Sequence, residues 1–434
     1  MGSRGGVRLS GMDVFHVRLH QEVRWRGLAG NSCSLVLELD GRVDEARLRE
    51  RAEAAAGLLP ELRWRLGRDL RLQPVWRSRP CDVGNHLVTR SLGAADCPLD
   101  ATTAWLDEPT EAHRTWQLGL FRGHGADAVV LRWFHPLADA RGGQRLLTWL
   151  GEGSGALCPP PPPEQRFASV DERVRALDGS KRWELLRSYR DHVLGIAEGE
   201  IVSLDAATGQ RRPGRTRAVR ICLDEERTAE LDGRLRRQAG ASETSVLVYA
   251  AARLLARALA AHSIVPEQHT VVVPVSLDAQ RGSTRMFGNN LTMMMLTLSS
   301  EELADRGRAL ASLAAQRREV VRQRLDLGFL AALHTARYMP APIYSWFSKR
   351  PFGGERMSVL VTHPGNWSID SFLGVAVRDA YPLPAAVLPP GLQVVAGRHH
   401  GRLSLTVVFV DSVISMGQVA ELTESLEQDV LGTG

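Results

Sequence analysis

Lysine is almost absent from this chain of 434 residues, which contains only Lys181 and Lys349, so nearly all its basic residues are arginines. The arginines are dispersed, without a basic tract and without the aromatic-interleaved basic motif of RNA-binding proteins. The formal charge of +5 therefore predicts a generic arginine-rich surface and argues against a nucleic-acid partner. Such a surface is compatible with an acidic partner or a phosphate-bearing cosubstrate.

Paired cysteines are also missing. The five cysteines are odd in number, scattered and without a C-x-x-C spacing, which argues against a disulfide framework and a structural zinc site. The adjacent His399 and His400 have no third ligand at a suitable spacing. We therefore expect a surface turn at these histidines and no metal site.

Long hydrophobic runs are absent as well. No run reaches the ~18 apolar residues of a membrane span, and residues 1–11 are too polar for the apolar core of a signal peptide. The hydrophobic fraction of 44% and the charged fraction of 24% are typical of globular proteins. Composition therefore predicts a soluble, cytoplasmic protein.

The first part of the chain alternates strand and helix patterns. Residues 32–39 predict a strand, and Asp44 is placed to cap a helix over 45–56. A second buried strand is expected over 128–134. Residues 158–163 are a cysteine followed by five prolines, and such a segment is extended and typical of a linker.

After the proline tract the pattern begins again. Strands are expected over 217–223, 271–275, 291–298 and 402–410, with helices over 171–196, 224–236, 243–259 (capped by Ser242) and at the C-terminus. We predict an α/β protein of two similarly built halves, 1–165 and 166–434. Their sheets should be mixed rather than purely parallel.

His135 and Asp139 are the strongest candidates for chemistry. They follow the strand predicted over 128–134 and precede Gly142 and Gly143, where a helix is expected to begin. A histidine at the end of a buried strand has a fixed backbone, which suits a general base. Asp139 is placed to cap the helix. A structural core histidine is the alternative.

Several short motifs follow one another along the chain. They are an opening Ser10-Gly11-Met12-Asp13-Val14-Phe15, His135-Pro136-Leu137-Ala138-Asp139, Pro274-Val275-Ser276, Gly288-Asn289-Asn290, Thr362-His363-Pro364-Gly365 and Tyr381-Pro382 before Gly401-Arg402-Leu403. In their order the chain resembles the coenzyme-A-dependent acyltransferase superfamily that includes condensation domains. Within it, the chain is most similar to bacterial wax ester synthase/diacylglycerol acyltransferase proteins.

The chain departs from the family's pattern at informative positions. Phe134 replaces the first histidine of the H-H-x-x-x-D-G motif, and Ala140 replaces its glycine. Asp278 stands where the family has the arginine that pairs with the motif aspartate. Arg281 or Arg285 would have to pair with Asp139 instead, or Asp139 is only a helix cap.

The resemblance implies two chloramphenicol-acetyltransferase-like halves around a central cleft or tunnel, with His135 as general base and Asp139 holding its loop. Candidates for binding the substrate or the oxyanion are Gly142, Ser276, Asn290, Thr362 and His363. Alternate side chains of Met293-Met294-Met295 are candidates to line an acyl tunnel, although core packing is the alternative. The aromatic-rich stretch from 329 to 347 favours packing against a sheet, with a lipid-facing or partner-facing surface as the alternative, which leaves peripheral membrane contact open.

The resemblance thus implies an acyltransferase that moves an acyl group from acyl-coenzyme A or an acyl carrier protein to an alcohol or amine. No resident cofactor is expected, and the thioester is a cosubstrate. The absence of a G-x-S-x-G elbow fits a reaction without a covalent enzyme intermediate. The alternative is a non-catalytic condensation-like module that binds a carrier protein or a partner enzyme.

Overall fold

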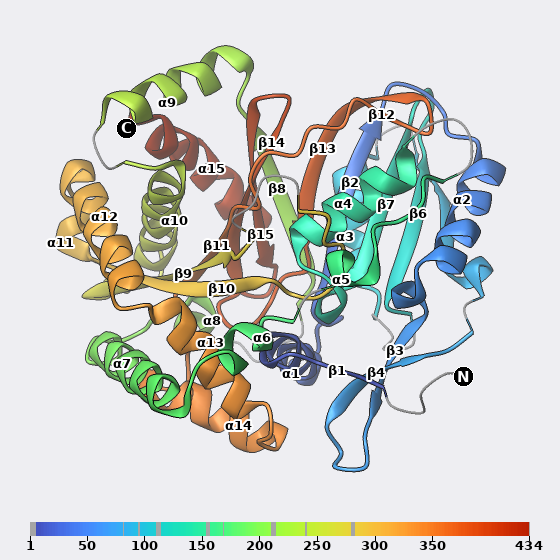
Figure 1. Cartoon of the computed structure of the whole chain (residues 1–434). Helices are drawn as coiled ribbons and strands as arrows, with labels where there is room; N and C mark the ends of the chain where they lie inside the picture. Colours follow the sequence, from blue (N-terminus) through green and yellow to red (C-terminus); the bar gives the residue numbers. More distant parts are fainter. Residues whose placement is uncertain are drawn as a thin grey trace.

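The computed structural model describes residues 6–80, 82–93, 96–109, 114–152, 157–167, 169–209, 214–238, 241–278 and 283–433. The chain forms two lobes, each built around a six-stranded sheet. Figure 1 shows them side by side, with α2 and α4 on the lobe that begins the chain and α9, α10 and α15 on the other. A small third sheet joins β1 (Val7–Arg8), β4 (Pro74–Ser78) and β3 (Trp64–Arg68).

The first large sheet has the strand order β12-β13-β2-β7-β6-β5. Its strands are β12 (Ser371–Phe372), β13 (Val375–Pro384), β2 (Ser32–Leu39), β7 (Asp127–Phe134), β6 (Trp116–Arg122) and β5 (Leu87–Ser91). Only β5 and β6 are parallel; the other neighbours in this sheet are antiparallel. All residues of β7 are buried, because this central strand is covered on both faces.

The second large sheet has the order β10-β9-β11-β14-β15-β8. Its strands are β10 (Leu291–Ser299), β9 (Gln268–Ser276), β11 (Val359–Thr362), β14 (Leu392–His399), β15 (Arg402–Val410) and β8 (Thr216–Cys222). The short β11 is parallel to both of its neighbours, and the remaining pairs are antiparallel. The predicted α/β class with mixed sheets is confirmed.

Helices cover the sheets and fill the space between them. The first part of the chain contributes α1 (Gly11–Trp25), α2 (Glu45–Leu58), α3 (Pro98–Leu106), α4 (Ala140–Gly151), α5 (Pro163–Arg166), α6 (Asp171–Arg175), α7 (Gly179–Ala197) and α8 (Leu204–Thr208). The later part contributes α9 (Glu225–Arg237), α10 (Glu243–Ala260), α11 (Ser300–Leu303), α12 (Arg306–Arg322), α13 (Leu325–Ala336), α14 (Ala341–Lys349) and α15 (Met416–Leu431). In the view of Figure 1, α7, α13 and α14 lie below β9 and β10.

The lobes do not divide the chain at one point. β12 and β13 lie far beyond the proline tract, yet β13 pairs with β2 and so completes the sheet of the first lobe. The chain after 165 therefore contributes strands to both sheets, and the predicted boundary at 165/166 is not a boundary between the sheets. Sequence periodicity could not show this exchange, because a strand pattern carries no information about its partner.

Several predicted elements are confirmed. The strand over 32–39 is β2, and Asp44 caps α2 by accepting the amides of Ala46 and Arg47. Residues 157–162 form no helix or strand, and Pro163 begins α5, where its missing amide costs nothing. His400 and Gly401 both have positive φ and form the two-residue turn between β14 and β15, so the expected surface turn is confirmed for His400. For His399 it is wrong, because His399 is the buried last residue of β14.

Two buried histidines are held in their neutral form. The Nδ1 atom of His86 lies 2.6 Å from the carbonyl oxygen of Trp116. Neither ring nitrogen of His269, on β9, has a hydrogen-bond partner in the part of the chain that the structure describes. Both residues are at most 2% exposed. Burial lowers the pKa of each to about 4, against 6.5 for an exposed histidine.

We expect the free energy of unfolding to decrease as the pH falls from 6.5 towards 4. In that range the unfolded chain binds protons at both positions, whereas the folded chain does not, so the loss is on the order of 1–2 kcal/mol for each histidine at pH 5 relative to pH 7. Urea titrations at several pH values measure it. The His269→Leu variant should be less sensitive to pH in this range, and equal sensitivity would show that His269 titrates normally.

Candidate active site

His135 lies where β7 ends. Pro136 follows it, lacks an amide hydrogen and begins a single 3-10 turn, His135–Leu137, so the strand cannot continue. Since Ser32 of β2 pairs with Phe134, the preceding Asn31 lies opposite His135, and its carbonyl oxygen accepts the His135 amide at 3.3 Å. Two neighbouring strands therefore fix the backbone of His135.

The His135 side chain is partly exposed, but its Nδ1 atom is buried and has no hydrogen-bond partner among the described residues. Nε2 is therefore the nitrogen left to meet a substrate. Burial lowers the pKa of His135 to about 4, while its own backbone carbonyl and Asn289 act in the opposite direction. The imidazole is neutral near pH 7, which is the form that a general base needs.

Asn289 supports His135 from the second lobe. It is fully buried, and its Nδ2 atom donates both to the carbonyl oxygen of His135 at 3.1 Å and to Asp13 at 2.9 Å. Asp13 closes a capping box with Ser10 at the start of α1. Burial raises the pKa of Asp13 to about 6. The motifs containing Ser10, Asp13 and Asn289 were visible in the sequence, but their contact was not.

His16 is a site residue that the sequence analysis missed. Its ring, on α1, stacks on the ring of His135 with centroids 3.7 Å apart and planes 14° apart. His16 is buried, and the Asn31 side-chain nitrogen lies 3.2 Å from its Nδ1 atom. No motif marked His16, because only the packing of α1 against the end of β7 brings the two rings together.

Asp139 joins the His135 loop to the second lobe. One carboxylate oxygen accepts the Gly142 amide at 2.8 Å and caps α4, and the other accepts the Asn290 amide at 3.0 Å. Gly288 also donates its amide to the carbonyl oxygen of Leu137. Burial raises the pKa of Asp139, and the two amides act in the opposite direction. Asp139 is thus more than a helix cap.

The arginine expected beside Asp139 pairs elsewhere. Arg285 lies 3.1 Å from Asp278, and Arg145 lies 2.9 Å from the other oxygen of the same carboxylate. Burial tends to raise the pKa of Asp278, but the two guanidinium groups hold it below its ordinary value. The prediction that Arg285 pairs with Asp139 is therefore wrong, because Arg285 forms an ion pair with Asp278. Arg281 lies outside the described residues.

The predicted oxyanion donors are largely occupied. The Gly142 amide is bound to Asp139, the Asn290 backbone amide to the same carboxylate, and the Asn290 side chain to Asp278. The Ser276 hydroxyl accepts the Asp278 amide at 3.2 Å. The amides of Gly142 and Asn290 thus stabilise the loop in this structure, and oxyanion binding by Asn290 or by backbone amides near Gly142 stays a prediction.

Thr362 and His363 lie at the end of β11, in a turn that Arg141 connects to the start of α4. The Arg141 guanidinium donates to the carbonyl oxygen of Pro364 at 3.0 Å. His363 Nε2 lies 3.7 Å from the Glu243 carboxylate, and burial lowers the pKa of His363. The structure thus ties this turn to the helix that follows the His135 loop. Substrate binding by Thr362 or His363 stays a prediction.

A cavity of about 760 Å³ lies between α7, α13, α14, β10 and α1; neither His16 nor His135 lines it. Its volume is within the range of small-molecule sites, and its walls are mainly apolar. Phe15 forms part of the wall, and its ring contacts that of His16 with centroids 5.2 Å apart. Met293 and Met295 line the cavity while Met294 does not, as expected for alternate residues of a strand.

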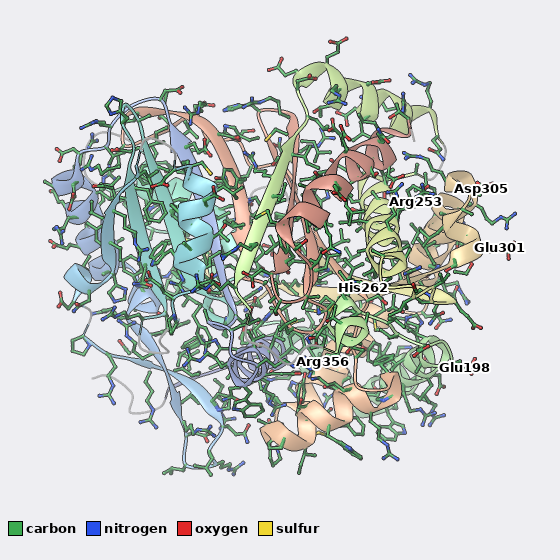
Figure 2. All side chains as sticks on the ribbon, turned by 180° about the vertical axis from the view of Figure 1, so that it is seen from behind. Glu198, Arg253, His262, Glu301, Asp305 and Arg356 are labelled. Carbon is green, nitrogen blue, oxygen red and sulfur yellow. The ribbon has the colours of Figure 1, made fainter. Side chains whose placement is uncertain are left out.

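The cavity lies beside an exposed aromatic helix. In the 329–347 stretch, α13 packs against β10, whereas Trp346 and Phe347 of α14 are 57% and 60% exposed. The prediction of packing against the sheet is therefore wrong for α14. Arg356, labelled in Figure 2, lines the same cavity beside α1 and α14 and donates to Glu22 at 2.8 Å.

Among the described residues, no helix is long and apolar enough to cross a membrane. No group of three or more histidine, cysteine, aspartate or glutamate side chains in the same residues is arranged to hold a metal ion.

The fold matches solved structures, although no protein-family model and no curated protein matches the chain. The first condensation domain of the CDA synthetase superposes with a TM-score of 0.71 at 18% identity, covering 99% of this chain and 96% of that domain. A trichothecene 15-O-acetyltransferase from Fusarium sporotrichioides gives 0.68 at 13% identity (99% and 97%). A wax ester synthase/diacylglycerol acyltransferase from Marinobacter aquaeolei VT8 gives 0.61 at 15% identity (98% and 98%).

The fold is therefore the one that these condensation domains and acyltransferases share, with two chloramphenicol-acetyltransferase-like lobes. The resemblance predicted from the short motifs is confirmed at the level of the fold. The wax ester synthase gives a lower TM-score than the condensation domain. The fold therefore does not single out the wax ester synthases as the most similar proteins.

We expect Asp139→Ala to decrease the free energy of unfolding by about 2–4 kcal/mol, because it leaves two buried amides from different lobes without acceptors. Asp44→Ala is the matched control: it removes the exposed cap of α2 and should cost about 1 kcal/mol. Urea unfolding measures both variants. Equal losses would show that Asp139 acts only as a helix cap.

Proposed function

We propose that this protein is an acyltransferase, with His135 as the general base. It moves an acyl group with an apolar chain from a thioester, either acyl-coenzyme A or an acyl carrier protein, to an alcohol or amine. The observation that carries the proposal is the neutral, partly exposed His135 ring at the junction of the two lobes. A large apolar cavity, with Phe15 on its wall, lies two ring contacts away. The fold of known condensation domains and acyltransferases supports it.

In this reaction the hydroxyl oxygen or amine nitrogen of the acceptor attacks the thioester carbonyl, and Nε2 of His135 accepts the proton that this oxygen or nitrogen loses. The tetrahedral intermediate then collapses, the carbon–sulfur bond breaks, and the proton passes to the departing thiolate. Asn289 supports the protonated ring, since its side chain raises the pKa of His135. Base catalysis of this kind contributes about 10²–10⁴-fold to the rate.

The cavity suggests the class of acyl chain. Its walls combine aromatic rings with the flexible thioethers of Met293 and Met295, which adapt to apolar ligands. Phe15 and His16 connect this cavity to His135 through successive ring contacts. We therefore assign the cavity to the acyl chain of the donor, whose thioester carbon would lie near Nε2 of His135.

His135→Gln should decrease kcat by about 10²–10⁴-fold with little change in KM, because the ring supplies the base and binds little of the substrate. Free thiol release from acyl-coenzyme A and from acyl carrier protein, with alcohols and amines as acceptors, measures this and identifies the donor. Equal turnover by wild type and His135→Gln would exclude His135 as the base. A loaded carrier that binds wild type without turnover would support the non-catalytic module.

Met295→Ala should shift the preferred acyl chain towards greater length, because the truncated side chain enlarges the cavity. Consider an acyl chain two methylenes longer than the one that the wild type prefers. We expect the ratio of kcat/KM for this longer chain to kcat/KM for the preferred chain to be about tenfold higher in Met295→Ala than in the wild type. Met294→Ala is the matched control, since Met294 does not line the cavity. A chain-length profile that Met295→Ala leaves unchanged would show that the acyl chain binds elsewhere.

A further inference from the structure

His16 and His135 form a stacked pair of imidazoles in which at most one ring carries a charge. With centroids 3.7 Å apart in a buried setting, two positive charges would repel each other strongly. A single imidazolium is stabilised by a neutral aromatic face next to it. The pair therefore accepts one proton at most, and its second ring then acts as the neutral partner.

The surroundings of the two rings decide which one takes that proton. The backbone carbonyl of His135 and the Asn289 side chain both raise the pKa of the His135 ring. The Asn289 Oδ1 atom is buried and has no hydrogen-bond partner among the described residues. Nε2 of His16 is buried and has no hydrogen-bond partner among the described residues. The contact of His16 with Asn31 fixes the orientation of its ring. The proton belongs on His135, and His16 stays neutral.

We propose that His16 is a positioning residue of the acyl transfer. Its neutral ring holds the His135 ring in the stacked orientation and stabilises the imidazolium that His135 becomes. The proposal rests on the proposed function, because the imidazolium exists only after Nε2 of His135 has taken the proton of the acceptor. When that proton passes to the departing thiolate, both rings are neutral again. His16 neither gains nor loses a proton in the cycle.

Three variants separate the ring face from other roles of His16. His16→Phe keeps an aromatic face, whereas His16→Leu fills similar space without one. His16→Gln removes the face but keeps a polar group for Asn31. His262→Leu is the control for loss of a histidine, since His262 is exposed beyond the end of α10 and is labelled in Figure 2.

The first measurement is thiol release at pH 7.5. We expect kcat to fall about tenfold to thirtyfold in His16→Leu and His16→Gln with KM unchanged, and to stay within about threefold of wild type in His16→Phe. His262→Leu should match wild type. If His16→Gln kept the wild-type kcat and His16→Phe lost it, the contact with Asn31 and not the aromatic face would determine kcat, and the proposal would be overturned.

The second measurement needs no substrate. Diethyl pyrocarbonate reacts with a neutral imidazole, and positive charge develops on the ring as its nitrogen attacks the carbonyl. The carbethoxylation rate of His135, followed by mass spectrometry of its peptide, should fall in His16→Leu and His16→Gln and be retained in His16→Phe. Thermal unfolding of each variant shows that it is folded at the temperature of the assay.

The two measurements distinguish the failure of each proposal. If wild type releases no thiol from any donor, the proposed function is wrong, and the carbethoxylation rates still decide whether His16 stabilises charge on His135. If all three variants modify His135 at the wild-type rate, the role of His16 is excluded whatever the turnover. A variant that does not fold leaves the decision to the other two.

Discussion

One buried carboxylate holds the centre of this protein together. Asp139 accepts an amide from Gly142, at the start of α4, and another from Asn290, just before β10. The first contact shapes the loop that carries His135, and the second fixes that loop against the other lobe. His16 stacks on His135 and Asn289 donates to its carbonyl oxygen next to this junction.

The regular elements could be predicted from the sequence because each one depends on local pattern. The strand over 32–39 and the capped helix after Asp44 are examples, since alternation and capping are properties of adjacent residues. The general location of the site also followed from motif order. Three contacts could not be predicted, because a local pattern does not show which side chains or strands meet in space. They are the pairing of β13 with β2, the stack of His16 on His135 and the ion pair of Arg285 with Asp278.

The site combines a polar support with an apolar approach. Behind His135, the chain Asp13–Asn289 supplies hydrogen bonds through buried groups, and burial keeps the imidazole neutral. Beside it, Phe15 and the methionines of β10 offer a surface without charge. The ion pairs of Arg145 and Arg285 with Asp278 stabilise the loops around the site. Among the described residues, the hydrogen-bond partners of the Asp139 carboxylate are two backbone amides.

The exchange of β12 and β13 between the lobes limits how this protein can be divided or recombined. A fragment ending in the proline tract would lack β12 and β13 and would expose the unpaired backbone of β2. Such an exposed strand edge promotes aggregation. A chimera that exchanges one lobe with a relative must therefore carry residues 371–384 together with the first lobe. The proline tract therefore does not mark a point at which the chain can be cut into two separate lobes.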